Sequence, residues 1–135
     1  MDLKTSVAVS ASGLRAQALR MRVIAENLAN ADSVATSAGG APYRRRVVTF
    51  QPSLDRADEA GGVKVRGVES DRADFQRIYQ PSNPAADPAG YVLKPNVNGL
   101  VEAADMKTAQ RSYEANLNAI EAARSLTMRT IDLLK

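Results

Sequence analysis

The 135-residue sequence contains no cysteine and no histidine. Without cysteine the chain can form no disulfide bond and no thiolate site, and without histidine it lacks the commonest metal ligand and acid–base group of enzymes. Tryptophan is absent too, and only four tyrosines and two phenylalanines supply large aromatic side chains for a dense core. These absences disfavour catalysis, and we expect no catalytic residue, no cofactor and no metal ion.

The sequence also lacks an apolar run that is long enough to cross a bilayer. Near the N-terminus, Arg15, Arg20 and Arg22 interrupt the apolar core that a secretory signal peptide would need. We therefore expect neither stable membrane insertion nor a cleavable signal. A cytoplasmic protein fits this pattern, and so does a protein exported by a route that reads no such signal.

Apolar residues recur with helical spacing near both ends of the chain. From about residue 6 to residue 31, Val7, Leu14, Met21 and Leu28 occupy every seventh position, while Val9, Ala16, Leu19 and Val23 fall on the opposite side. From about residue 100 to the end, one stripe runs from Met106 to Leu134, and Leu126 and Leu133 lie on a second side with several alanines. Both predicted helices are therefore apolar on two faces.

A helical hairpin would cover only one face of each helix. We expect the second faces to be covered by copies or relatives of the same chain, because an exposed apolar stripe otherwise favours aggregation. An ordinary intramolecular hairpin is the alternative. The residues expected to pack between subunits are Val7, Leu14, Met21, Ile24, Leu28, Met106, Tyr113, Leu117, Ile120, Ile131 and Leu134.

The middle of the chain, from Tyr43 to about Tyr79, predicts a small β unit. The segments RRVVTF, GVKVRGVE and DFQRIY are short and rich in β-branched and aromatic residues, and the turn-like DRADEAGG and SDRAD separate them. In the later YVLKPNVNG segment, Pro95 disfavours helix at Lys94, and Asn98 or Gly99 is a suitable cap for the next helix. The fold class is therefore mainly α with a small β part: a helix over 1–32, a loop and β-rich part over 33–99, and a helix over 100–135. We expect the two helices to pair as one coiled-coil-like domain.

Three consecutive arginines, Arg44 to Arg46, follow Tyr43. They could be a solvated basic run that protects a sheet edge, or they could pair with carboxylates of adjacent subunits. A small nucleic-acid-binding protein is the alternative from another class, but it needs a broader basic surface with aromatic side chains for stacking. The fifteen acidic residues are scattered throughout the chain, which disfavours that alternative.

Two acidic segments, DRADEAGG and ESDRAD, could in principle supply paired carboxylates for catalysis. Both have the composition of exposed turns, without the apolar surroundings that shift a catalytic pKa. The glycine pairs lack the spacing and the lysine of a phosphate-binding loop. Binding of the helices to a membrane surface is also disfavoured, since alanine-rich faces without tryptophan or phenylalanine bind bilayers poorly.

Three residues of the first predicted helix have two readings each. Gly13, inside the helix, could be merely tolerated, or it could let a neighbouring backbone approach. Asn27 and Asn30 could be solvated polar residues, with Asn30 ending the helix in a left-handed conformation, or they could make specific assembly contacts.

Four segments resemble a known family. SGLRAQALRMRVIAENLANADS is similar to the N-terminal signature of the flagellar rod and hook axial proteins, and GGAPYRRRVVTF, GYVLKPNVN and AQRSYEANLNAIEAARSLTMRTIDLLK resemble a rod protein of that family. The resemblance implies a structural subunit of the proximal rod in the bacterial flagellar basal body. In such proteins the terminal helices pair into a hollow inner tube around the export channel, which transmits torque, and the β part lies outside it.

The resemblance also implies partners and a location. The partners would be copies of the chain, other rod proteins, an adaptor of the membrane ring or export gate at the rod base and, transiently, the type III export apparatus. The chain would lie in the periplasmic part of the basal body, exported without a cleavable signal. The residues carried over as family motif and as the joint between the layers are Gly13, Asn27, Asn30, Tyr43, Arg44, Arg45, Arg46, Tyr91, Pro95, Asn96, Asn98 and Asn116.

Overall fold

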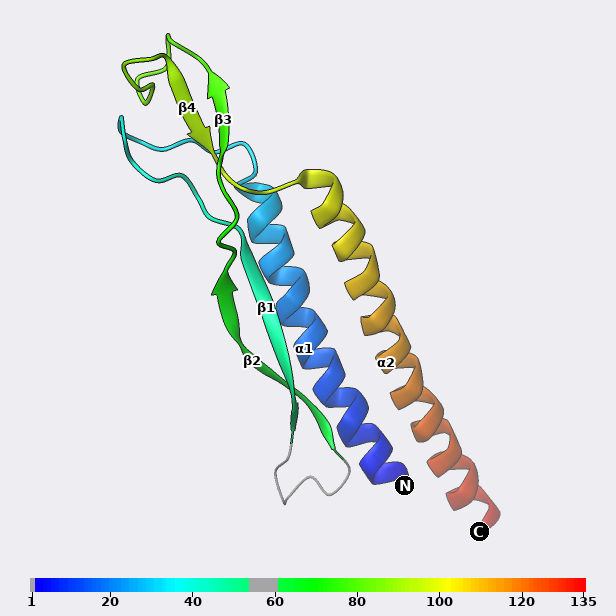
Figure 1. The fold of residues 1–135 in the computed structure, drawn as a ribbon. Helices are drawn as coiled ribbons and strands as arrows, with labels where there is room; N and C mark the ends of the chain where they lie inside the picture. Colours follow the sequence, from blue (N-terminus) through cyan, green and yellow to red (C-terminus); the bar gives the residue numbers. More distant parts are fainter. Residues whose placement is uncertain (1, 54–60) are drawn as a thin grey trace. The chain divides into compact units, whose positions relative to one another are not determined.

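A computed structural model of the chain describes residues 2–53 and 61–135. The elements in this part of the chain are, in order, α1 (Leu3–Ala29), β1 (Arg46–Ser53), β2 (Gly62–Ser70), β3 (Gln76–Tyr79), β4 (Tyr91–Lys94) and α2 (Gly99–Leu133) (Figure 1). The predicted fold class, mainly α with a small β part between two long helices, is confirmed.

Helix α1 begins at Leu3, within the predicted span 1–32, and Asp2 caps it: the Asp2 Oδ1 accepts a hydrogen bond of 2.7 Å from the Thr5 N–H. At the other end, the prediction that Asn30 adopts a left-handed conformation is wrong, since no non-glycine residue in the described part of the chain has a positive φ. Instead, the Asn30 Nδ2 donates to the carbonyl oxygen of Glu26 at 2.8 Å. The side chain thereby satisfies a carbonyl of the last turn.

Helix α2 begins as predicted at the Asn98 cap. The Asn98 Oδ1 accepts hydrogen bonds from the N–H groups of Leu100 and Val101 at 3.0 and 3.3 Å, so two of the free amides of the first turn are satisfied. Pro95, just before the cap, is fully buried. It fixes the path of the chain into the helix.

The three predicted strands are confirmed as β1, β2 and β3, but the sequence did not reveal β4. Two separate two-stranded sheets form, β1-β2 and β3-β4, and the second is antiparallel with Tyr79 opposite Tyr91 and Gln76 opposite Lys94. Strand β4 was missed because its four residues lie between the proline-rich PSNPAADPAG segment and Pro95, a pattern typical of a connection. The predicted turn DRADEAGG falls largely on residues 54–60, which lie outside the described residues.

The described residues form two compact units. The first draws on Met1–Met21, Val48–Gly67 and Lys107–Lys135, and its buried side chains are small, above all Ala16, Ala109 and Ala123. Within this unit the Ser12 Oγ accepts a hydrogen bond of 3.1 Å from the Val63 N–H, which ties α1 to β2. Small side chains at the centre allow close approach of the elements.

The second unit draws on Arg22–Val47 and Val68–Met106. Its apolar core contains Val23 and Ile24 of α1, Val92 of β4 and Val97. Two polar side chains, Asn27 and Glu102, are buried in the same unit with no exposed area at all. A carboxylate that is fully buried needs compensating partners, which directs attention to its surroundings.

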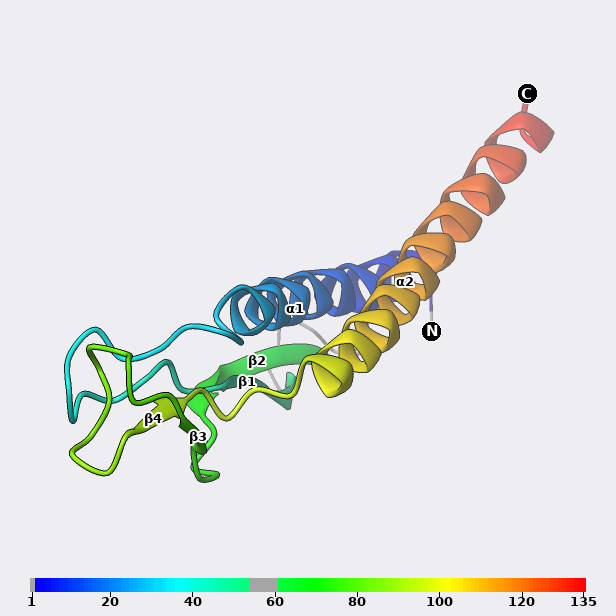
Figure 2. The same cartoon turned by 90° about the horizontal axis from the view of Figure 1, so that it is seen from above.

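The expected subunit-packing residues differ widely in burial. Ile24 is buried, six others are half-buried, and Leu28, Leu117, Ile131 and Leu134 are exposed. On the second side of α2, Leu126 and Leu133 are 53% and 87% exposed. In Figures 1 and 2 the C-terminal turns of α2 extend beyond α1. None of the described helices is long and apolar enough to span a membrane.

Candidate functional site

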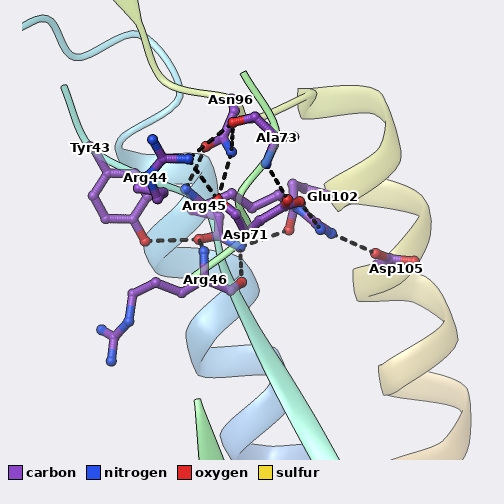
Figure 3. A network of polar contacts seen from close by, with 10 residues as sticks. Tyr43, Arg44, Arg45, Arg46, Asp71, Ala73, Asn96, Glu102 and Asp105 are labelled. Carbon is purple, nitrogen blue, oxygen red and sulfur yellow. Dashed lines mark hydrogen bonds and ion pairs between the residues drawn. The ribbon is translucent and has the colours of Figure 1, made fainter. Parts of the chain in front are cut away.

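The second unit contains a polar junction, which we define as Asn27, Tyr43, Arg44, Arg45, Arg46, Asp71, Asn96, Glu102 and Asp105. Figure 3 shows Arg45 near the centre of this group, with its contacts directed at Glu102 and Asp105 of α2, whereas the Arg46 guanidinium points away from α2. The junction residues come from α1, from the start of β1 and the loop before it, from the segment after β2, and from both sides of the Asn98 cap. The junction therefore links segments that are far apart in the sequence.

Arg45 and Glu102 form the centre of the polar junction. Glu102 has no exposed area, and its Oε1 accepts a short charge-assisted hydrogen bond from the Arg45 Nε. The other two guanidinium nitrogens of Arg45 reach the Asp71 Oδ2 at 3.2 Å and the Asp105 Oδ2 at 3.5 Å. One cation thus contacts three carboxylates, and the planar guanidinium is suited to this because it presents donors in several fixed directions.

Asp71 remains ionised in this arrangement. The backbone N–H of Ala73, which donates to Asp71 at 2.9 Å, lowers the pKa of this carboxyl, and the hydrogen bond and charge of Arg45 lower it further. The negative form is the one that pairs with Arg45. The ESDRAD segment was expected to be only an exposed turn, which is wrong for Asp71, since its side chain is 29% exposed and tied to Arg45.

Asn27 links the helix α1 to the rest of the junction. Its Nδ2 donates to the carbonyl of Arg46 at 2.8 Å and to the Glu102 Oε2 at 3.1 Å. Its Oδ1 accepts from the Tyr43 hydroxyl at 2.8 Å and from the Arg46 N–H at 3.0 Å. An asparagine can donate and accept at the same time, so this single buried side chain of α1 satisfies groups from the loop before β1, from β1 and from α2.

Tyr43 is held in the donor form that this contact needs. Burial raises the pKa of the Tyr43 hydroxyl above its usual value, so the group stays protonated and donates to Asn27 throughout the neutral range.

Arg44 and Asn96 bind the segment that follows β2. The Arg44 NH1 and the Asn96 Nδ2 both donate to the carbonyl oxygens of Asp71 and Ala73, at distances of 2.9 to 3.1 Å. The Asn96 Oδ1 accepts from the Arg45 N–H at 2.7 Å. The Arg44 guanidinium also lies 4.1 Å from the ring centroid of Phe75, a cation–π contact.

The three arginines therefore have three different environments. Arg45 is engaged by three carboxylates of its own chain, an arrangement that neither interpretation of the arginine run included. Arg44 binds backbone carbonyls and Phe75, whereas Arg46 makes a 3.0 Å ion pair with Glu26 on the surface of α1. Glu102 accounts for the difference, because a fully buried carboxylate needs a compensating cation and Arg45 supplies it.

The structure brings together six of the residues predicted for the layer joint: Asn27, Tyr43, Arg44, Arg45, Arg46 and Asn96. Pro95 is buried one position before Asn96, Asn98 caps α2, and Asn30 lies at the end of α1. Tyr91 lies elsewhere, on β4, where its ring packs edge-on against Tyr79 with centroids 5.3 Å apart. Gly13 and Asn116 belong to the first unit.

Sequence reasoning missed the acidic side of the junction, which consists of Asp71, Glu102 and Asp105. Glu102 lies in the first turn of α2, where an acidic residue is ordinarily explained by the helix dipole. The arginine run was the one feature of the sequence that could have indicated these carboxylates, because arginines that become partly buried need acidic partners. Nothing in the local pattern indicated which carboxylates would supply it.

We expect Tyr43→Phe to lower the free energy of unfolding by about 1 kcal/mol, because it removes one hydrogen bond to the buried Asn27 amide and leaves the ring in place. Urea unfolding followed by circular dichroism would measure this change. Tyr79→Phe is the matched control, since Tyr79 is largely exposed and should change stability little. An equal effect of both substitutions would contradict the role of the Tyr43 hydroxyl.

Two parts of the chain match known families. Residues 8–35 match the family described as "Flagella basal body rod protein", and residues 89–133 match the family described as "Flagellar basal body rod FlgEFG protein C-terminal". Together with the two long terminal helices, these matches define the class: a rod protein of the bacterial flagellar basal body.

Similarity to whole proteins narrows the class. The chain is 48% identical to flagellar basal-body rod protein FlgC of Agrobacterium fabrum, over 98% of this chain and 96% of the relative. It is 42% identical to FlgC of Salmonella typhimurium over 93% of this chain and 92% of the relative, and 39% identical to FlgC of Bacillus subtilis over 96% and 97%. The chain belongs to the FlgC family of flagellar basal-body rod proteins, and the resemblance seen in the sequence is confirmed.

Proposed function

We propose that this structural rod subunit assembles through its two terminal helices into the hollow drive shaft of the flagellum, around the export channel. The observation that carries the proposal is the set of exposed apolar side chains at the C-terminal end of α2 and just beyond it, which lie on both of its apolar faces. Leu126, Ile131, Leu133 and Leu134 are all exposed in the isolated chain. A helix of this kind gains stability when neighbouring subunits remove these side chains from water.

The polar junction has a mechanical role in this proposal. A shaft that transmits torque needs a stiff connection between its helices and the β-rich part of each subunit. Arg45, Glu102 and Asn27 supply hydrogen bonds that require one geometry, whereas apolar contacts alone tolerate sliding. The junction therefore holds the C-terminal end of α1 and the N-terminal end of α2 against the start of β1.

A non-catalytic role is consistent with the chemistry of the junction. Its central side chains bind one another: Asn27, Tyr43, Arg45 and Glu102. Their polar atoms therefore stabilise the fold and are not directed at a substrate. The nucleic-acid alternative loses its main support, because the Arg45 charge is directed at Glu102, Asp71 and Asp105.

The proposed location is the periplasmic part of the rod, reached through the flagellar type III export apparatus without a cleavable signal. The proposed neighbours are copies of the chain, other rod proteins and an adaptor at the rod base. Support comes from the family to which the chain belongs and from the two apolar faces of its terminal helices.

Amide hydrogen exchange tests the assembly. We expect residues 6–31 and 102–134 to be at least about 100-fold better protected in isolated basal bodies than in the purified chain, because packing on neighbours suppresses local opening. The internal control is the β3-β4 hairpin, which is not part of the helices that are proposed to pack on neighbours and should change less. Equal protection of the helices in both samples would contradict assembly through them.

A further inference from the structure

A line of small residues on α2 is interrupted by one polar residue. Ala109 and Ala123 are almost completely buried, and Asn116 lies midway between them at heptad spacing. Residues seven apart lie along one side of a helix, and a single asparagine in such a line is known to define how two helices align. Asn116 is half-buried and belongs to the first unit.

The group that faces this asparagine is Gly13 of α1. A Cβ atom added at Gly13 would lie 2.8 Å from both the Nδ2 and the Oδ1 of Asn116 and 2.9 Å from its Cγ. Gly13 does not have a positive φ, so its backbone conformation would suit any residue. The close approach of Asn116 is what favours glycine here, and within the chain the group nearest to Gly13 is this side chain.

The alignment is specific because α1 has one position without a side chain. Gly13 is the only glycine in α1. Moving α2 by one helical turn in either direction would set the Asn116 amide against positions that carry a side chain: Val9, Ser10, Ala16 and Gln17. The amide is also anchored along its own helix, since its Nδ2 donates to the carbonyl of Ser112 at 2.8 Å.

We propose that Asn116 and Gly13 form a register key that sets the axial alignment of α1 and α2. The alignment determines which residues of α1 lie beside which residues of α2. It therefore also determines which outward-facing side chains contact a neighbouring subunit. This second part rests on the proposed assembly, whereas the key itself is a property of the single chain.

The test is a cycle of four purified chains: the parent, Gly13→Ala, Asn116→Ala and the double variant. Gly13→Ala should lower the folding equilibrium constant about tenfold in the parent, because the new methyl group collides with the Asn116 amide. In the Asn116→Ala background the same substitution should raise it about fivefold, since alanine is the better helix former once the amide is gone. Urea unfolding measures all four constants.

The register key is supported if Gly13→Ala lowers the folding equilibrium constant in the parent and raises it in the Asn116→Ala background. The same sign in both, or four coincident unfolding curves, would overturn it. Swimming assays in cells that carry each variant in place of the parent chain test the second part separately. We expect Gly13→Ala to impair swimming and the double variant to restore it. A change of sign in unfolding with normal swimming of the Gly13→Ala cells would overturn only the link to assembly.

Discussion

Arg45→Met should lower the free energy of unfolding by about 3–5 kcal/mol. The substitution keeps most of the apolar stem of Arg45 but leaves Glu102, which has no exposed area, without its cation. Removing one partner of a buried ion pair is far more costly than the net value of the pair, because the remaining charge stays away from water. Urea unfolding of the purified chain, followed by the helical circular dichroism signal, measures the loss.

Two further variants separate this cause from a general sensitivity of the arginine run. Arg46→Met should cost less than about 1 kcal/mol, since Arg46 pairs with Glu26 at the surface, where both side chains are more than 40% exposed. The double variant Arg45→Met with Glu102→Leu should recover most of the stability, because it removes both charges together. A loss below about 1 kcal/mol for Arg45→Met, or no recovery in the double variant, would refute the central role of the pair.

Leu126→Asp should abolish assembly and leave the isolated chain almost unchanged. The Leu126 side chain is 53% exposed in the single chain, so a carboxylate there remains in water and stability is preserved. In the assembled rod the same position is expected to face a neighbouring subunit, where an unpaired charge would cost at least about 3 kcal/mol and weaken the contact about 100-fold. Swimming and the amount of the chain in isolated basal bodies give the readout.

Ser125→Asp is the matched control for this experiment. It introduces the same charge one position earlier, about 100° around the helix, at an exposed residue. Leu14→Asp and Ile120→Asp should also block incorporation, but both side chains are half-buried in the chain, so they would destabilise the subunit as well. Normal swimming of cells with Leu126→Asp would refute the assignment of this face to a subunit contact.

Arg45→Met and Leu126→Asp test two different kinds of contact. The first concerns groups that the chain satisfies by itself, and the second concerns apolar side chains that it leaves exposed. A rod subunit needs both, because a stiff connection within each subunit is useful only if the subunits themselves are held together.

The sequence alone determined the elements that depend on local pattern. The 3.6-residue period of the apolar residues predicted α1 and α2 and showed that each is apolar on two faces. The β-branched segments predicted β1, β2 and β3, and the Asn98 cap was recognised because capping involves residues within one turn. Strand β4 was missed, since four residues between prolines carry too little periodic signal.

Only the tertiary structure decided which polar groups meet. Arg45 and Glu102 are 57 residues apart in the chain, and Asn27 and Glu102 are 75 apart, so no spacing rule links them. The three arginines look alike in sequence, yet only Arg45 finds a fully buried carboxylate. Likewise, Gly13 has no unusual backbone angle, and its need for glycine arises from Asn116 of the distant helix. The periodicity of apolar residues indicates which faces of each helix avoid water. The pairing of charged groups, and the contact of Gly13 with Asn116, depend on how the folded chain brings those faces together.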